Sequence, residues 1–133
     1  MRHGKQRTGG GLALLLGVMW PALARAAPPS TDPAQCFDLS RHQGVLALDD
    51  RTVLVRVDAN LYRLDLADRC PGLERPDPRI TLVAHGGTFV CGKLDYDLHV
   101  GEGGLANALP CTIASQRRLT PDEVAAIPRN KRP

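Results

Sequence analysis

Two acidic residues and a histidine alternate along one short stretch of the chain. Asp95, Asp97 and His99 occupy every second position. In a β-strand such residues project from the same face, with successive Cα atoms about 6.5–7 Å apart. Two carboxylates and an imidazole could bind a divalent metal ion, or act as general acid and base in a small hydrolase.

The same alternation is also typical of the solvent-exposed face of an amphipathic strand, where charged side chains need no ligand. We favour this second interpretation for Asp95, Asp97 and His99. Side chains on one strand converge less than a metal site requires, so a metal ion would need further ligands from a loop. We therefore predict no metal ion, no cofactor and no catalytic residue here, and keep the hydrolase or metal-binding protein as the alternative.

Other segments contain reactive side chains but lack the pattern that each chemistry needs. Ser40 and His42 are close in sequence, but no Gly-x-Ser-x-Gly motif marks a nucleophile. Asp49 and Asp50 are an acidic pair of the kind that hydrogen-bonds local backbone in a turn. Residues 101–104 are rich in glycine but lack the Lys-Ser/Thr that follows in a phosphate-binding loop.

The four cysteines point to structure rather than to chemistry. Cys36, Cys70, Cys91 and Cys111 are separated by 34, 21 and 20 residues. No Cys-x-x-Cys pair is present, which disfavours a zinc site and thiol–disulfide catalysis. An even number of cysteines in an exported chain predicts two disulfides.

Chain entropy does not choose among the three possible pairings, since they differ by only about 1 kcal/mol. On topological grounds we predict Cys70–Cys91 and Cys36–Cys111. The first bridge would fasten the irregular segment after Cys70, and the second would tie the first segment of the fold to its last strand. The rival pairing, Cys36–Cys70 with Cys91–Cys111, keeps both bridges local.

The N-terminus has the three regions of a secretory signal peptide. Basic residues at positions 2, 5 and 7 precede an apolar run over 12–23, which is too short for a comfortable membrane span. Small residues at 24 and 26 suit a signal peptidase. We predict a signal peptide over 1–26, a flexible leader over 27–35, one disulfide-stabilised β domain over 36–127 and a disordered tail over 128–133. No transmembrane anchor is expected after cleavage.

Cleavage changes the charge of the protein. The whole chain has a formal net charge of +3, but all four basic residues of positions 1–26 leave with the signal peptide, and residues 27–133 carry 13 Lys and Arg against 14 Asp and Glu. Because the charges nearly cancel, the composition of residues 27–133 does not indicate binding to nucleic acid. The predicted location is therefore periplasmic or secreted, with an unknown protein or envelope component as partner.

Short apolar runs separated by turn residues predict a mainly β fold. Residues 45–48, 52–58 and 61–67 read as an antiparallel meander, with Val53, Val55 and Val57 on one face. Three prolines make residues 68–79 a surface crossing. Further strands are predicted at 80–84, 88–91, 94–100 and 111–115, with 88–91 pairing back on its predecessor. We expect a small antiparallel sheet that curls into a sandwich or a partly open barrel.

The C-terminal region is predicted to form a helix rather than a strand. Thr120, Pro121 and Glu123 form a capping-box sequence with proline at the first helical position, which predicts a helix of about two turns. A helix this short is stable only when docked, here through Val124 and Ile127. Pro128 ends it.

Several of these segments, in this order, resemble a family of small exported proteins of Gram-negative bacteria that is known only as a domain of unknown function. They are CF at 36–37, LDDRTVLV at 48–55, LYRLDL at 61–66, RCPGL at 69–73 and RLTPDEV at 118–124, with Cys91 and Cys111 between the last two. The resemblance implies the compartment and the disulfide framework, and it transfers no catalytic residue. We therefore expect a non-enzymatic structural or partner-binding module.

Overall fold

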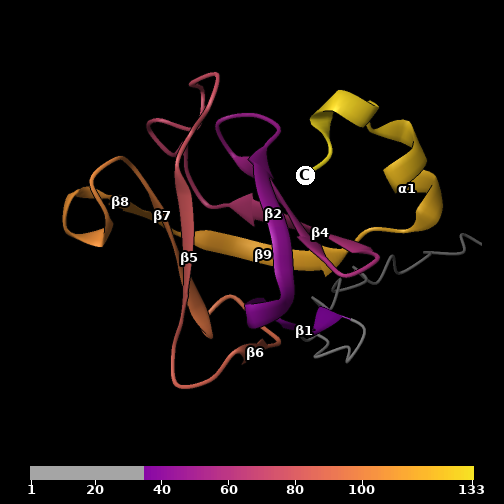
Figure 1. The fold of residues 1–133 in the computed structure, drawn as a ribbon, viewed down its shortest axis with the longest axis horizontal. Helices are drawn as coiled ribbons and strands as arrows, with labels where there is room; N and C mark the ends of the chain where they lie inside the picture. The colour runs from indigo at the N-terminus through magenta and orange to yellow at the C-terminus, as the bar shows by residue number, and fades with distance from the viewer. Residues whose placement is uncertain (1–34) are drawn as a thin grey trace, which may run out of the picture.

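Residues 35–133 are described by a computed structural model, in which nine strands and one short α-helix follow a curled path (Figure 1). The fold is mainly β, as predicted, and its three antiparallel sheets do not close into a barrel. The predicted signal peptide and nearly all of the leader lie outside the described residues. The strands are β1 (Phe37–Asp38), β2 (His42–Ala47), β3 (Thr52–Val57), β4 (Asn60–Leu66), β5 (Ile80–Ala84), β6 (Phe89–Val90), β7 (Tyr96–Val100), β8 (Leu109–Cys111) and β9 (Ile113–Arg118).

The largest sheet has the strand order β2-β3-β4-β9. Its first three strands are the predicted meander, and the valines at 53, 55 and 57 all face the main core. The two-residue connection between β3 and β4 uses Asp58 at φ 52°. Aspartate tolerates this left-handed region because its short polar side chain can hydrogen-bond locally.

The chain passes from one sheet to the next at Thr112. β8 ends at Cys111 and pairs with β7, whereas β9 begins at Ile113 and pairs with β4. The second sheet, with the order β5-β7-β8, is thereby turned away from the first. One continuous stretch of chain thus carries the sheet around a corner, and the inner faces enclose one core.

Fifteen buried residues from all three sheets and from the segments between them form that core, with Tyr96, Leu64 and Leu98 among the largest fully buried side chains. Phe37 packs against Tyr62 and Tyr96, with ring centroids 4.5 and 6.0 Å apart. The predicted inward face of residues 94–100 is correct for positions 96, 98 and 100. Leu94 is 81% exposed, because β7 begins only at Tyr96.

A second, smaller core lies on the other face of the four-stranded sheet. Leu54, Leu61 and Leu119 are buried there and contact Val124 and Ile127 of the helical segment. The helix α1 (Pro121–Ala126) has the predicted capping box, with Thr120 and Glu123 each hydrogen-bonding the other's backbone N–H. Docking through Val124 and Ile127 is confirmed.

The last six residues have defined structure and partners, whereas we expected a disordered tail over 128–133. They include the 3-10 helix η4 (Arg129–Lys131). Arg132 donates to the carbonyl of Ile127, and Arg56 of β3 donates to the carbonyl of Pro133. Pro133 also lies against Gly44, where an added Cβ would come within 3.1 Å of the proline ring. Charged side chains alone are therefore a poor sign of disorder when two arginines have carbonyl partners.

Two disulfides form, as predicted, but the predicted pairing is wrong, and so is the rival pairing. The bridges are Cys36–Cys91 and Cys70–Cys111, with Cα atoms 4.0 and 5.7 Å apart. The cause is the sheet that was not expected: β6 pairs with β1 rather than with β5. Phe37 is opposite Val90, so Cys36 and Cys91 are the next pair of positions in the same antiparallel register.

Cys70 meets Cys111 because Cys70 follows β4 in the chain and Cys111 lies just before the neighbouring strand β9. β4 pairs with β9, and the hydrogen bond from Ala67 N to Thr112 O, of 2.9 Å, extends this pairing past the end of β4. The two cysteines follow from there on the same side. The predicted surface crossing over 68–79 has no strand or helix, and Cys70 at its start is almost fully buried.

Candidate binding site at an open seam

Within residues 35–133, the backbone of β2 has one edge without a partner strand. β2 is the first strand of its sheet, and the hydrogen bond from Leu48 N to Thr52 O fixes which residues face β3. In an antiparallel ladder hydrogen-bonded pairs alternate, so Leu46 also bonds to β3. Val45 and Ala47 direct their N–H and C=O groups to the free edge.

The strand β5, at the edge of the second sheet, also has one edge without a partner strand within residues 35–133. The bonds from His85 N to Asp95 O and from Gly101 N to Arg79 O show that the odd-numbered residues of β5 bond to β7. The backbone groups of Ile80, Leu82 and Ala84 therefore point away from β7.

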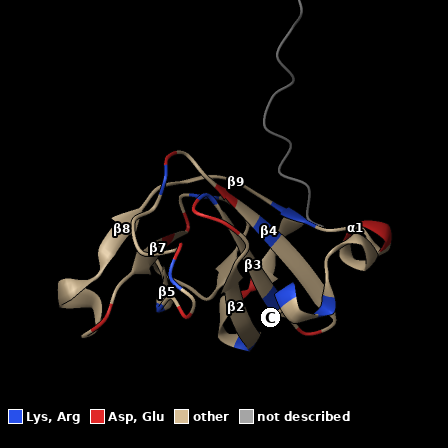
Figure 2. Ribbon diagram, turned by 90° about the horizontal axis from the view of Figure 1, so that it is seen from above, with Lys and Arg blue, Asp and Glu red and all other residues tan. Residues whose placement is uncertain are grey.

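These two free edges lie side by side in both ribbon views (Figure 1 and Figure 2), and no backbone hydrogen bond joins β2 to β5 among the described residues. We call this boundary the seam, and define it by the residues whose free backbone groups line it: Val45, Ala47, Ile80, Leu82 and Ala84. All five side chains are partly buried and pack against the main core. The seam therefore combines unpaired backbone with apolar side chains along the boundary between the two sheets.

A groove of about 660 Å³ opens between the end of β2 and the segment that precedes β5. Its walls are residues 45–50, the proline-rich segment 73–78, and Asn130 and Lys131 of η4. This volume is in the range of ligand-binding clefts in proteins. The groove is mixed in charge: Asp49, Glu74 and Asp77 line it together with Arg75 and Lys131. Asp50 also lines it and is paired with Arg69 at 2.7 Å.

The two edges lack the usual protection against strand pairing. Natural proteins guard edge strands with lysine, proline, inward-pointing charges or bulges. β5 has the sequence ITLVA and β2 has HQGVLA, so neither contains a proline or an Asp, Glu, Lys or Arg. A register shift between His42 and Gly44 disturbs only the start of β2.

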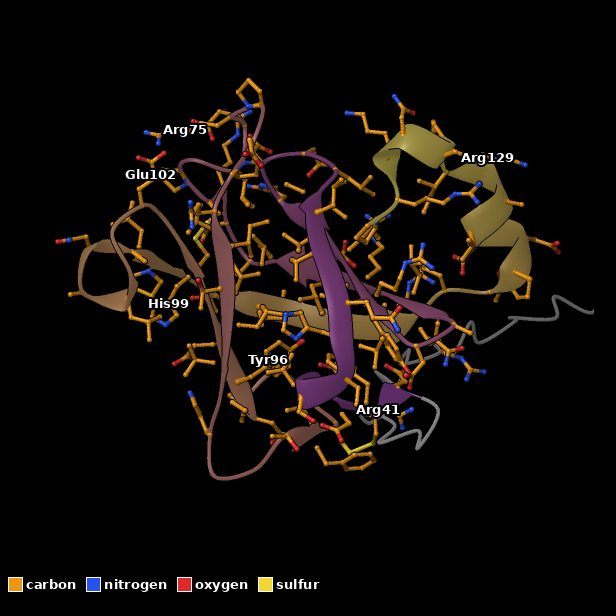
Figure 3. The ribbon with its side chains drawn as sticks, viewed as in Figure 1. Arg41, Arg75, Tyr96, His99, Glu102 and Arg129 are labelled. Carbon is orange, nitrogen blue, oxygen red and sulfur yellow. A yellow bond between two sulfur atoms is a disulfide. The ribbon has the colours of Figure 1, made fainter. Side chains whose placement is uncertain are left out.

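The three residues that the sequence places on one strand face have different surroundings: Asp97 and His99 share a face of β7, whereas Asp95 precedes the strand. The carboxylate of Asp95 accepts hydrogen bonds from the backbone N–H groups of Cys91 and Gly92, at 2.8 and 2.9 Å. It thereby closes the turn before β7. His99 is oriented by β7 next to Pro110, and its buried Nδ1 has no hydrogen-bond partner within residues 35–133 (Figure 3).

Asp97 contacts a histidine that the sequence analysis missed. Its Oδ2 lies 2.8 Å from Nε2 of His85, which comes from the end of β5. Both side chains are about half exposed. The antiparallel pairing of β5 with β7, which places Val83 opposite Asp97, brings this pair together. Within the described part of the chain, no three His, Cys, Asp or Glu side chains are grouped as metal ligands would be.

The remaining candidates have local structural roles. Ser40 donates from its backbone and its hydroxyl to Asp38, and Nδ1 of His42 lies 2.8 Å from the carbonyl of Leu39. Asp49 accepts from the backbone of Arg51, as a turn residue does. The glycine-rich residues 101–104 lead into the short 3-10 helix η3 (Leu105–Asn107).

Residues 11–133 of the chain match a described protein family, the family of unknown function DUF6491. The chain belongs to DUF6491. No curated protein and no solved structure is significantly similar to it. The DUF6491 membership agrees with the resemblance noted in the sequence and assigns no activity to any residue.

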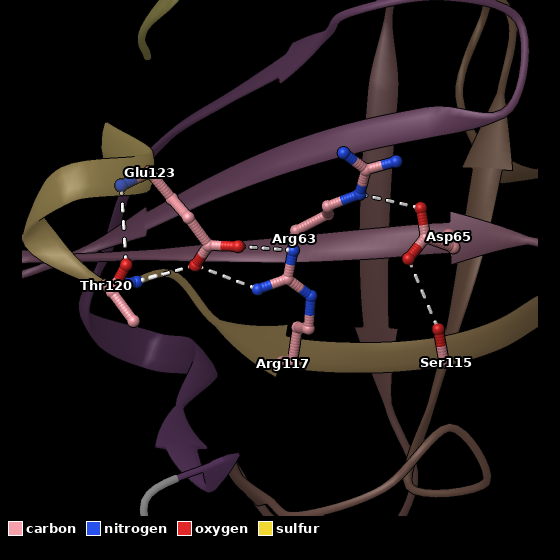
Figure 4. Close-up of polar contacts among 6 residues, drawn as sticks. All are labelled: Arg63, Asp65, Ser115, Arg117, Thr120 and Glu123. Carbon is pink, nitrogen blue, oxygen red and sulfur yellow. Dashed lines mark hydrogen bonds and ion pairs between the residues drawn. The ribbon is translucent and has the colours of Figure 1, made fainter. Parts of the chain in front are cut away.

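In this DUF6491 chain a polar network covers the outer face of the large sheet beside α1 (Figure 4). Arg63 donates to Asp65 at 2.7 Å, and Asp65 accepts from Ser115 of the neighbouring strand β9. Figure 2 shows the basic positions on β4 and β9 and the acidic first turn of α1. Every member has a partner among these six residues, and Arg117, Thr120 and Glu123 join β9 to the start of α1, which leaves the seam as the candidate site.

No helix within residues 35–133 has the length and apolar character needed to cross a membrane. The apolar run at 12–23 lies outside the described residues. Both disulfides are consistent with an oxidising, extracytoplasmic environment.

Proposed function

We propose that this protein is an exported module of the cell envelope that works by binding another polypeptide at the seam. The seam is the observation that carries this proposal. It exposes backbone donors and acceptors of Val45, Ala47, Ile80, Leu82 and Ala84 next to apolar side chains. Such edges are avoided or covered in proteins that have no partner for them.

Export is supported by the N-terminal sequence and by the cysteines. The basic, apolar and small-residue regions of positions 1–26 have the order of a signal peptide. Cys36–Cys91 and Cys70–Cys111 use every cysteine of the described chain. We place the mature N-terminus near Ala27 and the protein in the periplasm or outside the cell.

The contacts that the candidate catalytic residues make favour a binding role over catalysis. Asp95 is engaged with loop backbone, and Asp97 with His85 on the opposite strand, so neither is directed at a common point with His99. No observation favours the small hydrolase or metal-binding protein as a second candidate.

Cross-linking in living cells tests the binding role. A photoreactive benzoylphenylalanine replaces Thr81, which is exposed on β5 at the seam, and in a matched control replaces Asp122, which is exposed on α1. We expect one discrete adduct from position 81 and none from position 122. Equal adducts from both positions, or none from position 81, would contradict binding at the seam.

Fractionation tests export independently. We expect an intact mass corresponding to residues 27–133 with four cysteines oxidised, in the periplasm or the medium. A mass that retains residues 1–26, or recovery confined to the cytoplasm, would refute this part of the proposal.

A further inference from the structure

We propose that the partner enters the seam as an extended strand, and that its backbone pairs with both β2 and β5. This inference rests on the proposed function and specifies how the partner is recognised. It would make the occupant the closing strand of the barrel-like fold, by the same main-chain pairing that underlies β-strand addition in other proteins.

The arrangement of the free backbone groups identifies the occupant as a strand. The five residues whose side chains face the core are the same five whose N–H and C=O groups point into the seam. A strand alternates its hydrogen-bonding groups between its two sides with the same period of two. A single extended segment therefore satisfies both edges at once and directs every second side chain into the core.

Other occupants fit less well. A second folded copy could pair its own edge with β5 or with β2, but one rigid edge cannot enter between the two. The predicted leader of this chain has prolines at positions 28, 29 and 33, which lack backbone donors. An extended segment of another protein, free of proline and with small apolar residues at alternate positions, meets both requirements.

The charges near the seam indicate which charges the partner segment should carry. No Asp, Glu, Lys or Arg is present in β2 or β5, so the paired part of the partner is expected to be uncharged. At the groove three acidic side chains, Asp49, Glu74 and Asp77, outnumber the basic Arg75 and Lys131. A basic residue on the partner suits this end.

The position of Pro133 allows a direct test. Pro133 lies against Gly44 of β2, so a strand appended after it starts close to the seam. We would attach Thr-Val-Thr-Val-Thr-Lys through a Gly/Ser linker of roughly eight residues, which gives a local concentration in the millimolar range. The matched control carries Pro-Val-Pro-Val-Pro-Lys, which keeps the valines and the charge but lacks the donors at alternate positions.

Amide hydrogen exchange followed by NMR is the measurement, because exchange reports the pairing of each N–H group. In the unfused protein we expect fast exchange at Val45, Ala47, Ile80, Leu82 and Ala84, and slow exchange at Leu46, Thr81 and Val83. The appended strand should slow the first five at least tenfold, and the proline control should leave unchanged the amides of the edge that its prolines face.

Three results would overturn the inference. The first is protection of the five amides in the unfused monomer, since the seam would then be closed. The second is equal exchange in the fusion and the proline control. The third is a dimer by light scattering in which the five amides are protected, since a second copy would then be the occupant.

The exchange experiment and the cross-linking experiment can fail independently of each other. Protection by the appended strand without an adduct at position 81 would leave the seam able to bind a strand but remove the proposed function. An adduct at position 81 without such protection would keep the function and exclude strand pairing.

Discussion

Glu123 holds Arg117 and caps its own helix with the same carboxylate. Arg117 donates to both carboxylate oxygens at 2.8 and 2.9 Å, and the backbone N–H of Thr120 donates to Oε2 at 2.9 Å (Figure 4). The arginine comes from β9, so this pair joins the sheet to α1 at the point where the helix begins.

The stability of the α1 region should therefore depend on pH in the acid range. The hydrogen bond from Arg117, followed by that from Thr120, lowers the pKa of Glu123 from 4.5 to about 2. A carboxylate with a lowered pKa contributes stability that is present above its unfolded value and is lost as the pH falls from about 4.5 towards 2. We expect Glu123→Gln to lower the Tm at pH 7, with a difference that shrinks as the pH approaches 2. Asp122→Asn, on the same turn, is the control, and an equal effect of both variants would contradict this assignment.

Removing the centre of the small core should release the helix. Leu54 is fully buried between the sheet and the helical segment. Truncation of a buried leucine costs about 2–5 kcal/mol. We expect Leu54→Ala to lose that much stability in urea denaturation and to increase exchange of the α1 amides. Leu94→Ala, at an 81% exposed leucine, should change stability by less than about 0.5 kcal/mol. A similar loss in both variants would show that Leu54 has no special role.

A buried hydroxyl joins the two sheets. Tyr96 Oη donates to Oε1 of Gln116 at 2.7 Å, and burial raises the pKa of Tyr96 above its usual range. Tyr96→Phe leaves that amide oxygen without this donor, which should cost about 1–3 kcal/mol. Because the neutral form is stabilised, the contribution is present below pH 10 and is lost as the pH rises above it. The difference in unfolding free energy between wild type and Tyr96→Phe should therefore be constant from pH 6 to pH 9. A difference below about 0.5 kcal/mol would contradict a stabilising hydrogen bond.

Peptide mapping without reduction checks the disulfides. Trypsin cleavage at Arg41, Arg69, Arg79 and Lys93 separates all four cysteines. We expect the peptide of residues 80–93 to be linked to the one that ends at Arg41, and residues 70–79 to be linked to the peptide that contains Cys111. A linked pair of residues 70–79 and 80–93 would show a different fold around β6.

The features that could be predicted from the sequence are those decided by neighbours in the chain. Alternation along β3 placed three valines on the core side because the side-chain period of a strand is two. The capping box was predictable for the same reason, since Thr120 and Glu123 are three residues apart. Leu94 was misplaced because the alternating pattern extends beyond the strand, into a turn that is closed by Asp95.

The features that could not be predicted depend on which strands become neighbours. β1 and β6 have two residues each, too few for any periodic signal, and their pairing decides the partner of Cys36. His85 was overlooked as the partner of Asp97 because twelve residues separate them. The seam follows from the strand order alone, since nothing in ITLVA or HQGVLA says which side of the strand lacks a neighbour.

The two disulfides also set how far the protein can be stretched. The loop from Cys36 to Cys91 and the loop from Cys70 to Cys111 overlap, so a pulling force applied at both ends passes from Cys36 through sulfur to Cys91 and then along the 20 residues to Cys111. At about 3.5 Å per residue, that path extends to about 70 Å, against about 260 Å for the reduced chain over the same interval. An oxidised copy held between two anchored structures would thus behave as a short, nearly inextensible link, and reduction would turn it into a long, slack one.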